Sequence, residues 1–137
     1  MISLHEYITE SLNDKIFVII KPGFLNLSDE ILEKFTSNGY ELYQMKTKKL
    51  LLSEAKELYS IHKEEDFYED LCKYMSSDLS TAIIFKNSNS KNIFEDTKKI
   101  KDSIRKQYGE SDMRNVIHSS DSLSHMIDEQ SIYFNDI

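Results

Sequence analysis

The chain has 137 residues, which is enough for one domain with a buried core and too few for two. Its net charge of −7 argues against a general nucleic-acid binder, because contacts with a nucleic-acid backbone depend on Lys and Arg. No apolar run approaches the roughly 20 residues that span a bilayer, and the first residues lack the features of a signal peptide. Cys72 is the single cysteine, so no internal disulfide can form, and we expect a cytoplasmic protein that binds no membrane.

The spacing of apolar residues predicts the elements along the chain. A helical spacing in residues 1–14 predicts an N-terminal arm, ahead of a domain over residues 15–137. Helices are expected to begin near Ser28, Ser53, Phe67, Asn92 and Asp121, and residues 107–114 are loop-like. Apolar or alternating runs predict strands at residues 15–20, 40–46, 81–85 and 132–134, with the second of them half-buried.

This order of elements indicates the fold class. Strands alternate with helices that are long enough to serve as crossovers between them. We therefore expect an α+β fold: a ferredoxin-like split βαβ arrangement with a four-stranded antiparallel sheet and helices on one face.

The motifs that are absent narrow the chemistry. The chain has four histidines, His5, His62, His118 and His125, and none of them forms a tight metal-ligand pair. A metal site is therefore not expected. The chain also contains neither a P-loop nor a Gly-x-Ser-x-Gly motif, so phosphate binding would need another arrangement.

His118 is the strongest candidate for a catalytic residue. It stands between a short apolar run and a cluster of Ser and Asp, and a neutral imidazole has a nitrogen that can attack or accept a proton. Glu129 follows eleven residues later and could hold the second ring nitrogen. Spacing alone leaves two interpretations of His118, a nucleophile or an ordinary surface or core histidine.

Several segments together resemble the nucleoside diphosphate kinase family. The most specific is Asn-x-Ile-His-x-Ser-Asp-Ser at residues 115–122. The Lys-Pro end of the first strand and the Tyr-x-x-His segment starting at Tyr59 support it, as do residues 71–76 and Ile104 with Arg105. The resemblance covers residues 15–134 in order and in rough spacing.

The resemblance implies an activity and a role for each matching residue. It implies a ping-pong transfer of the γ-phosphate from a nucleoside triphosphate such as ATP to a nucleoside diphosphate through phosphorylated His118. The implied catalytic residues are His118, Glu129, Ser120 and Tyr59, and the implied nucleotide-binding residues are Lys21, Phe67, Arg105, Asn115 and His62. Within the second set, Lys21 and Asn115 would contact the ribose and Phe67 would stack on the base. It also implies Mg²⁺ carried on the nucleotide, a homo-oligomer of at least two chains and no specific nucleic-acid partner.

Most of these residues also have a purely structural interpretation. Tyr59 and Phe67 could be packing aromatics, Arg105 a solvated charge, His62 a spectator and Glu129 an ordinary helix carboxylate.

The chain departs from the family pattern in three places, the smallest of which is Ser119, where the family commonly has Gly or Ala. Gly23 and Phe24 follow the Lys-Pro pair, where the family usually has an acidic residue. Between Phe85 and Arg105 the chain is shorter, the Thr and Pro positions are missing, and Lys98 is the nearest match for a helix arginine. A hexamer is therefore not assumed. A divergent, weakly active or non-catalytic nucleotide-binding or interaction module is the alternative function.

Overall fold

The computed structural model describes residue 3 and residues 13–134, so the predicted helix within residues 1–14 lies almost wholly outside the described part. Its strands are β1 (Lys15–Ile20), β2 (Glu41–Lys48), β3 (Ser80–Lys86) and β4 (Ile117–Ser119). Its helices are α2 (Ser28–Thr36), α3 (Leu52–Leu58), α4 (Tyr68–Met75), α5 (Ile93–Tyr108) and α6 (Leu123–Tyr133), with short 3₁₀-helices η1 (Leu25–Leu27) and η2 (Ser60–His62).

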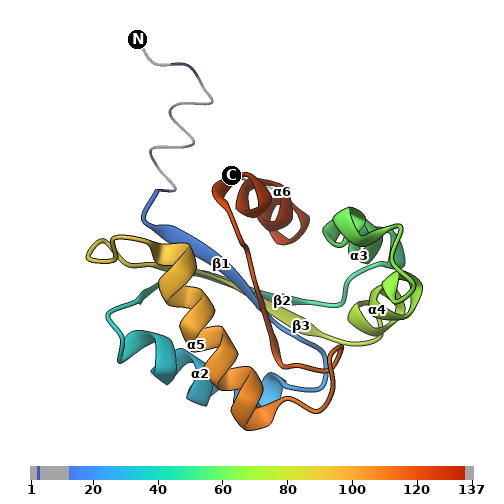
Figure 1. The fold of residues 1–137 in the computed structure, drawn as a ribbon, viewed down its shortest axis with the longest axis horizontal. Helices are drawn as coiled ribbons and strands as arrows, with labels where there is room; N and C mark the ends of the chain where they lie inside the picture. Colours follow the sequence, from blue (N-terminus) through green and yellow to red (C-terminus); the bar gives the residue numbers. More distant parts are fainter. Residues whose placement is uncertain (1–2, 4–12, 135–137) are drawn as a thin grey trace.

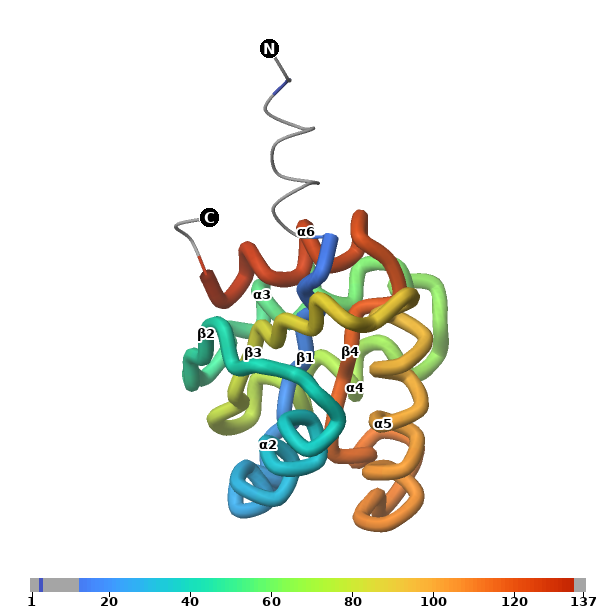
Figure 2. The backbone as a smooth tube through the Cα atoms, turned by 90° about the vertical axis from the view of Figure 1, so that its left-hand side faces the viewer, coloured from blue at the N-terminus to red at the C-terminus, as the bar shows by residue number. Residues whose placement is uncertain are grey.

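The strands form one four-stranded antiparallel sheet in the order β2-β3-β1-β4 (Figure 2). Helix α2 connects β1 with β2, and helix α5 connects β3 with β4, so two βαβ units interleave in the sheet (Figure 1). This is the predicted ferredoxin-like split βαβ arrangement, which the structure confirms.

The prediction that helices cover one face of the sheet is wrong. Along β1, Ile16, Val18 and Ile20 belong to a core cluster that includes residues of α2 and α5. Phe17 and Ile19, which point to the opposite face, belong to a second cluster that includes residues of α3, α4 and α6. The sequence carried this signal, because an uninterrupted apolar run is typical of a strand that is buried on both faces.

The fourth strand also differs from the prediction. Residues 132–134 were expected to form it, but α6 continues through Tyr133, and β4 pairs with β1 in their place. Tyr133 is held in the core by its ring contact with Phe17 and by a hydrogen bond between its hydroxyl and that of Ser80. An apolar triplet fits the buried side of a final helical turn as well as it fits a short strand.

Strand β2 is an edge strand that is more exposed than the predicted half-buried pattern. Among the described residues it pairs only with β3, and Leu42, Tyr43 and Met45 are 50 %, 59 % and 42 % exposed.

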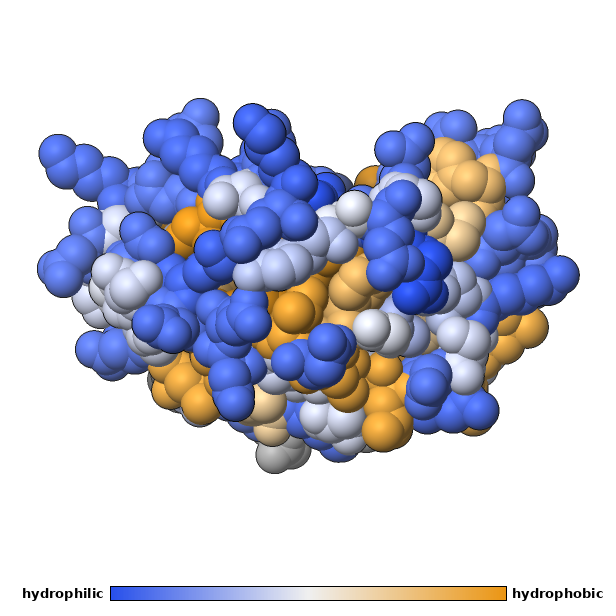
Figure 3. All heavy atoms as spheres, turned by 90° about the horizontal axis from the view of Figure 1, so that it is seen from below, coloured by the Kyte–Doolittle hydropathy of each residue, from blue (hydrophilic) through white to orange (hydrophobic). Residues whose placement is uncertain are grey.

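The face shown in Figure 3 is mostly hydrophilic, with smaller apolar areas between the polar side chains. No helix in the described part of the chain is both long and apolar enough to cross a membrane.

Gln130 on α6 is a buried polar side chain without a partner. Its exposed fraction is 0 %, and neither amide atom has a hydrogen-bond partner among the described residues. An unpaired buried polar group costs about 1–3 kcal/mol. We therefore predict that Gln130→Leu raises the free energy of unfolding by about 1–3 kcal/mol in urea titrations.

The exposed Gln107 on α5 provides the control for this prediction, since Gln107→Leu should change stability by less than about 0.5 kcal/mol. A loss of stability in Gln130→Leu would contradict the prediction and would show that the native amide is satisfied.

Candidate active site

Pairing between β1 and β4 brings the two ends of the site together. Ile19 lies opposite His118 in the ladder, and the backbone N–H of Lys21 donates to the carbonyl of Val116 at 2.8 Å. Lys21 directly follows β1, so the antiparallel register alone places its side chain near the histidine strand. Segments nearly a hundred residues apart in sequence thus form one surface.

A strained turn precedes His118. Val116 is buried and has a φ of 79°, and the N–H of Ile117 donates to the carbonyl of Asn115 at 3.0 Å. This three-residue turn is unfavourable for a β-branched residue, and strain of this kind concentrates at functional sites. Its effect is to aim the Asn115 side chain at Lys21, whose Nζ donates to Asn115 Oδ1 at 2.7 Å.

The imidazole of His118 is oriented by a carboxylate on α6. Its Nε2 contacts Glu129 Oε1, and the hydroxyl of Ser120 donates to the same oxygen at 3.4 Å. The side chains of His118 and Glu129 are only 19 % and 12 % exposed. A proton on Nε2, facing the carboxylate, leaves the lone pair on Nδ1. His118 therefore has one nitrogen fixed and the other available as a nucleophile.

A cavity of about 480 Å³ lies in front of this histidine. Six of the expected site residues line it, and the lining contains more cations than carboxylates. The lining residues are Lys21, Tyr59, His62, Phe67, Leu71, Lys101, Arg105, Asp112, Met113, His118, Ser119 and Asp121. Three other expected residues lie behind the lining. Glu129 contacts His118, Ser120 donates to Glu129, and Asn115 accepts a hydrogen bond from Lys21.

Aromatic rings form one wall of the cavity. Phe67 is 45 % exposed, and its ring lies 5.4 Å from that of His62. The ring of Tyr59 meets that of His118 at 5.8 Å, nearly edge to face, and its buried hydroxyl has no hydrogen-bond partner among the described residues. Burial raises the pKa of Tyr59, so its hydroxyl stays protonated and can donate to a bound group. An unpaired hydroxyl in a cavity wall indicates a ligand that completes it.

Three cations, Lys21, Lys101 and Arg105, also line the cavity. Burial, together with the charges of Arg105 and Lys101, lowers the pKa of Lys21 to about 7. The guanidinium of Arg105 donates twice to the carbonyl of Ile117, at 3.1 and 2.7 Å, which fixes its position beside the histidine strand. Like charges held this close destabilise one another unless an anion joins them. The cavity is therefore suited to a polyanion such as a phosphate chain.

The position of each basic residue on helix α5 determines whether its side chain lines the cavity. The resemblance gave Lys98 as the nearest match for a helix arginine, but its side chain is 65 % exposed and pairs with Asp102 at 3.9 Å. Arg105 lies within α5 and lines the cavity, and so does Lys101, one turn earlier. The structure does not bring Lys98 to the site, and it adds Lys101, which the sequence analysis missed. The available signal was the spacing of four residues, which puts Lys101 and Arg105 on one helix face.

Gly23 stands where the family usually has an acidic residue, and the structure shows why glycine fits. Its φ is +91°, and an added Cβ would lie 2.8 Å from Nη2 of Arg114. The Arg114 guanidinium lies 5.3 Å from the rings of both Phe24 and Tyr74, and its Nε pairs with Glu110 at 2.9 Å. Arg114 thus packs the segment that carries Asn115 against the turn that follows Lys21.

The start of α6 also differs in detail from the sequence prediction. The hydroxyl of Ser122 accepts from the backbone N–H of His125, so Ser122 caps the helix and not Asp121. Asp121 instead lines the cavity.

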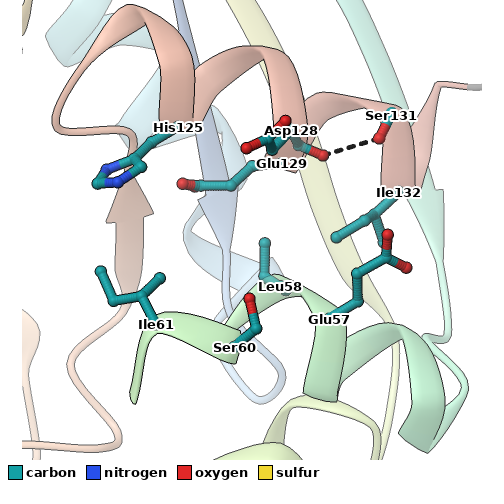
Figure 4. Close-up of a pocket in the computed structure, with 9 residues that line it drawn as sticks. All are labelled: Glu57, Leu58, Ser60, Ile61, His125, Asp128, Glu129, Ser131 and Ile132. Atoms are coloured by element: carbon teal, nitrogen blue, oxygen red, sulfur yellow. Dashed lines mark hydrogen bonds between the residues drawn. The ribbon is translucent and has the colours of Figure 1, made fainter. Parts of the chain in front are cut away.

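A second cavity, of about 260 Å³, lies between the α3–η2 segment and α6 (Figure 4). Its lining contains His125 and the carboxylates of Glu57, Asp128 and Glu129, and no Lys or Arg. Such a surface repels phosphate. Of the two cavities, the one in front of His118 is therefore better suited to a phosphate group, while this one lies behind the orienting carboxylate.

The low pKa of Lys21 gives a stability prediction. Its pKa is about 7 in the folded protein, against the ordinary value of 10.5 expected in the unfolded chain. The charged lysine therefore destabilises the folded protein, and this effect has its full size below pH 7. The cost fades between pH 7 and pH 10.5 and is absent above that range. Lys21→Met should therefore raise the free energy of unfolding by about 2–4 kcal/mol at pH 6, and by progressively less as the pH rises.

Urea titrations of the ligand-free protein between pH 6 and pH 10 measure this effect. The exposed Lys91 serves as the control, because Lys91→Met should leave stability nearly unchanged. A destabilised Lys21→Met variant at pH 6 would show that the charge is compensated within the fold.

Comparison with known proteins agrees with the geometry. A family model described as nucleoside diphosphate kinase matches residues 14–137. The chain is 34 % identical over 120 residues to the nucleoside diphosphate kinase of Geobacter sulfurreducens, across 80 % of this chain and 86 % of that one. It is 32 % identical over 130 residues to the enzyme of Fervidobacterium nodosum, across 88 % of each. The crystal structure of the Aquifex aeolicus nucleoside diphosphate kinase matches 87 % of this chain and 93 % of that chain, with a TM-score of 0.75 and 25 % identity. The chain therefore belongs to the nucleoside diphosphate kinase family.

Proposed function

We propose that this chain is a nucleoside diphosphate kinase that transfers the γ-phosphate of a nucleoside triphosphate to a nucleoside diphosphate through His118. The observation that carries the proposal is the fixed imidazole. Glu129 holds Nε2, while His118 lines a cavity that is rich in cations. Phosphoryl transfer needs mainly positioning and charge stabilisation, and this site offers both.

In the first half-reaction, Nδ1 of His118 attacks the γ-phosphorus. The new N–P bond forms as the bond from phosphorus to the bridging oxygen breaks, and the diphosphate leaves with that oxygen's electron pair. Glu129 stabilises the positive charge that the ring acquires. Lys21 and Arg105 stabilise the negative charge on the leaving oxygens. In the second half-reaction, a terminal oxygen of another diphosphate attacks the phosphorus. The new O–P bond forms as the N–P bond breaks, and the electron pair of that bond returns to Nδ1 and restores the neutral imidazole.

The remaining site residues hold the nucleotide. We infer that the base stacks on Phe67, the most exposed aromatic of the cavity wall, which reads any base by its π-face. The linked side chains of Lys21 and Asn115 contact the ribose hydroxyls, and Lys21 also reaches the transferred phosphate. The unpaired hydroxyl of Tyr59 donates to a phosphate oxygen, and His62 lies beside it.

We also infer that Mg²⁺ enters bound to the nucleotide. Among the described residues, no group of three or more His, Cys, Asp or Glu side chains is placed to hold a metal ion. The cavity contains only the carboxylates of Asp112 and Asp121, whereas Mg²⁺ takes six oxygen ligands. Asp112 and Asp121 are the residues that would face an ion carried on the phosphates. The ion adds positive charge at the transferred phosphate.

A homo-oligomer is proposed from strand β2, which pairs only with β3 among the described residues. An edge strand with exposed apolar side chains, here Leu42, Tyr43 and Met45, is a surface suited to pairing with a second copy. Sedimentation velocity at micromolar concentration should show at least a dimer, and a monomer at all concentrations would contradict the proposal. The proposed location is the cytoplasm, where nucleotide substrates are available.

The proposed chemistry predicts a specific labelling pattern. Incubation with γ-labelled ATP should give an acid-labile label on the wild type and none on His118→Ala. Glu129→Gln keeps the shape but loses the charge that orients the ring, so labelling should slow by about 10–100-fold. His125→Ala is the control, since His125 lines the other cavity and should leave labelling unchanged.

Equal labelling of the wild type and His118→Ala would contradict the proposed nucleophile. A wild type that binds ADP but takes up no label would favour the alternative, a non-catalytic nucleotide-binding module. The specific reason to retain that alternative is the shorter segment between Phe85 and Arg105, which lacks a clear match for the helix arginine of the family.

A further inference from the structure

We propose that Lys101 is a phosphate-binding residue of the nucleotide cavity, where it supplies a cation that the loop between α5 and β4 does not. The inference rests on the proposed function and deepens it. The family resemblance assigned no role to this residue.

The first observation is burial without a partner. Lys101 is 7 % exposed and lines the same cavity as His118. Within the described part of the chain, its ammonium group makes no hydrogen bond and no ion pair. The side chain is largely buried, but its ammonium group stays open to the cavity, and an ammonium in such a position normally pairs with a carboxylate or with carbonyl oxygens. The missing partner is therefore expected in the cavity.

The second observation is the charge around it. Arg105 lies one turn further along the same helix face, and the Lys21 side chain approaches from the end of β1. Burial, followed by the charge of Arg105, lowers the pKa of Lys101, while the carboxylates of Asp121 and Asp102 act in the opposite direction. Neither carboxylate lies within ion-pair distance of its ammonium group. Three cations therefore converge without a matching number of anions.

The third observation is the helix face that carries Lys101. Ile93, Thr97 and Ile104 on α5 are buried against the sheet, and Lys101 is buried with them. An apolar residue would continue this face at no electrostatic cost. Lys98, one turn earlier, shows where a lysine without a ligand lies, because it is exposed and paired with Asp102.

The connection from α5 to β4, residues 109–116, reaches the cavity but brings no cation to it. It contributes Asp112 and Met113 to the lining. Lys101 and Arg105, four residues apart, instead present two charges from one rigid element.

The matched pair Lys101→Met and Lys98→Met tests this role. Both variants remove one lysine from the same helix, but only one of them lines the cavity. Isothermal titration with ADP, with pyrophosphate as a second ligand, should give a dissociation constant about 10–100-fold higher for Lys101→Met than for Lys98→Met. Lys101→Arg should recover part of the affinity, since it restores the charge with a different shape.

Thermal unfolding without ligand separates binding from folding. Lys101→Met should unfold at the wild-type temperature or above it, because the variant removes an uncompensated buried charge. The same variant should raise the KM for the diphosphate more than it lowers kcat. Equal ADP affinity in Lys101→Met and Lys98→Met, with a wild type that still labels His118, would overturn this inference and leave the proposed function intact. A wild type that neither labels His118 nor binds ADP would overturn the proposed function itself.

Discussion

The contact between Nε2 of His118 and the carboxylate of Glu129 is the interaction on which the site depends. It joins β4 to α6, and both elements must be in place before it can form. Pairing of β4 with β1 fixes the histidine, and the Ser122 cap fixes the start of the helix that carries the glutamate. The contact selects which ring nitrogen faces the cavity. In this way the fold converts an ordinary imidazole into a directed nucleophile.

Several groups near this contact destabilise the ligand-free protein. A bound phosphate chain would neutralise their charges or accept their hydrogen bonds. Lys21 and Lys101 are largely buried cations with like charges beside them, and the buried hydroxyl of Tyr59 has no hydrogen-bond partner among the described residues. All three residues line the cavity in front of His118. The backbone is strained at Val116, directly before the strand that carries His118. These unfavourable groups therefore offset part of the stability that the core provides.

Local patterns predicted most of the elements because each has a strong periodicity. The buried run of β1 and the helical spacing of α5 are examples. Other features depend on tertiary context. The strand β4 has only three residues, so residues 132–134 fit a final strand equally well until the pairing with β1 is known. The choice between Lys98 and Lys101 depends on how α5 is rotated against the sheet, which its sequence does not specify.

The position of the phosphoryl group on the histidine ring tests the account most directly. The protein is phosphorylated with ATP, the modified residue is mapped, and NMR of the ring then distinguishes Nδ1 from Nε2. Because Glu129 occupies Nε2, the account predicts a single phosphoryl group on Nδ1 of His118. Phosphorylation at Nε2, or at a residue other than His118, would contradict it.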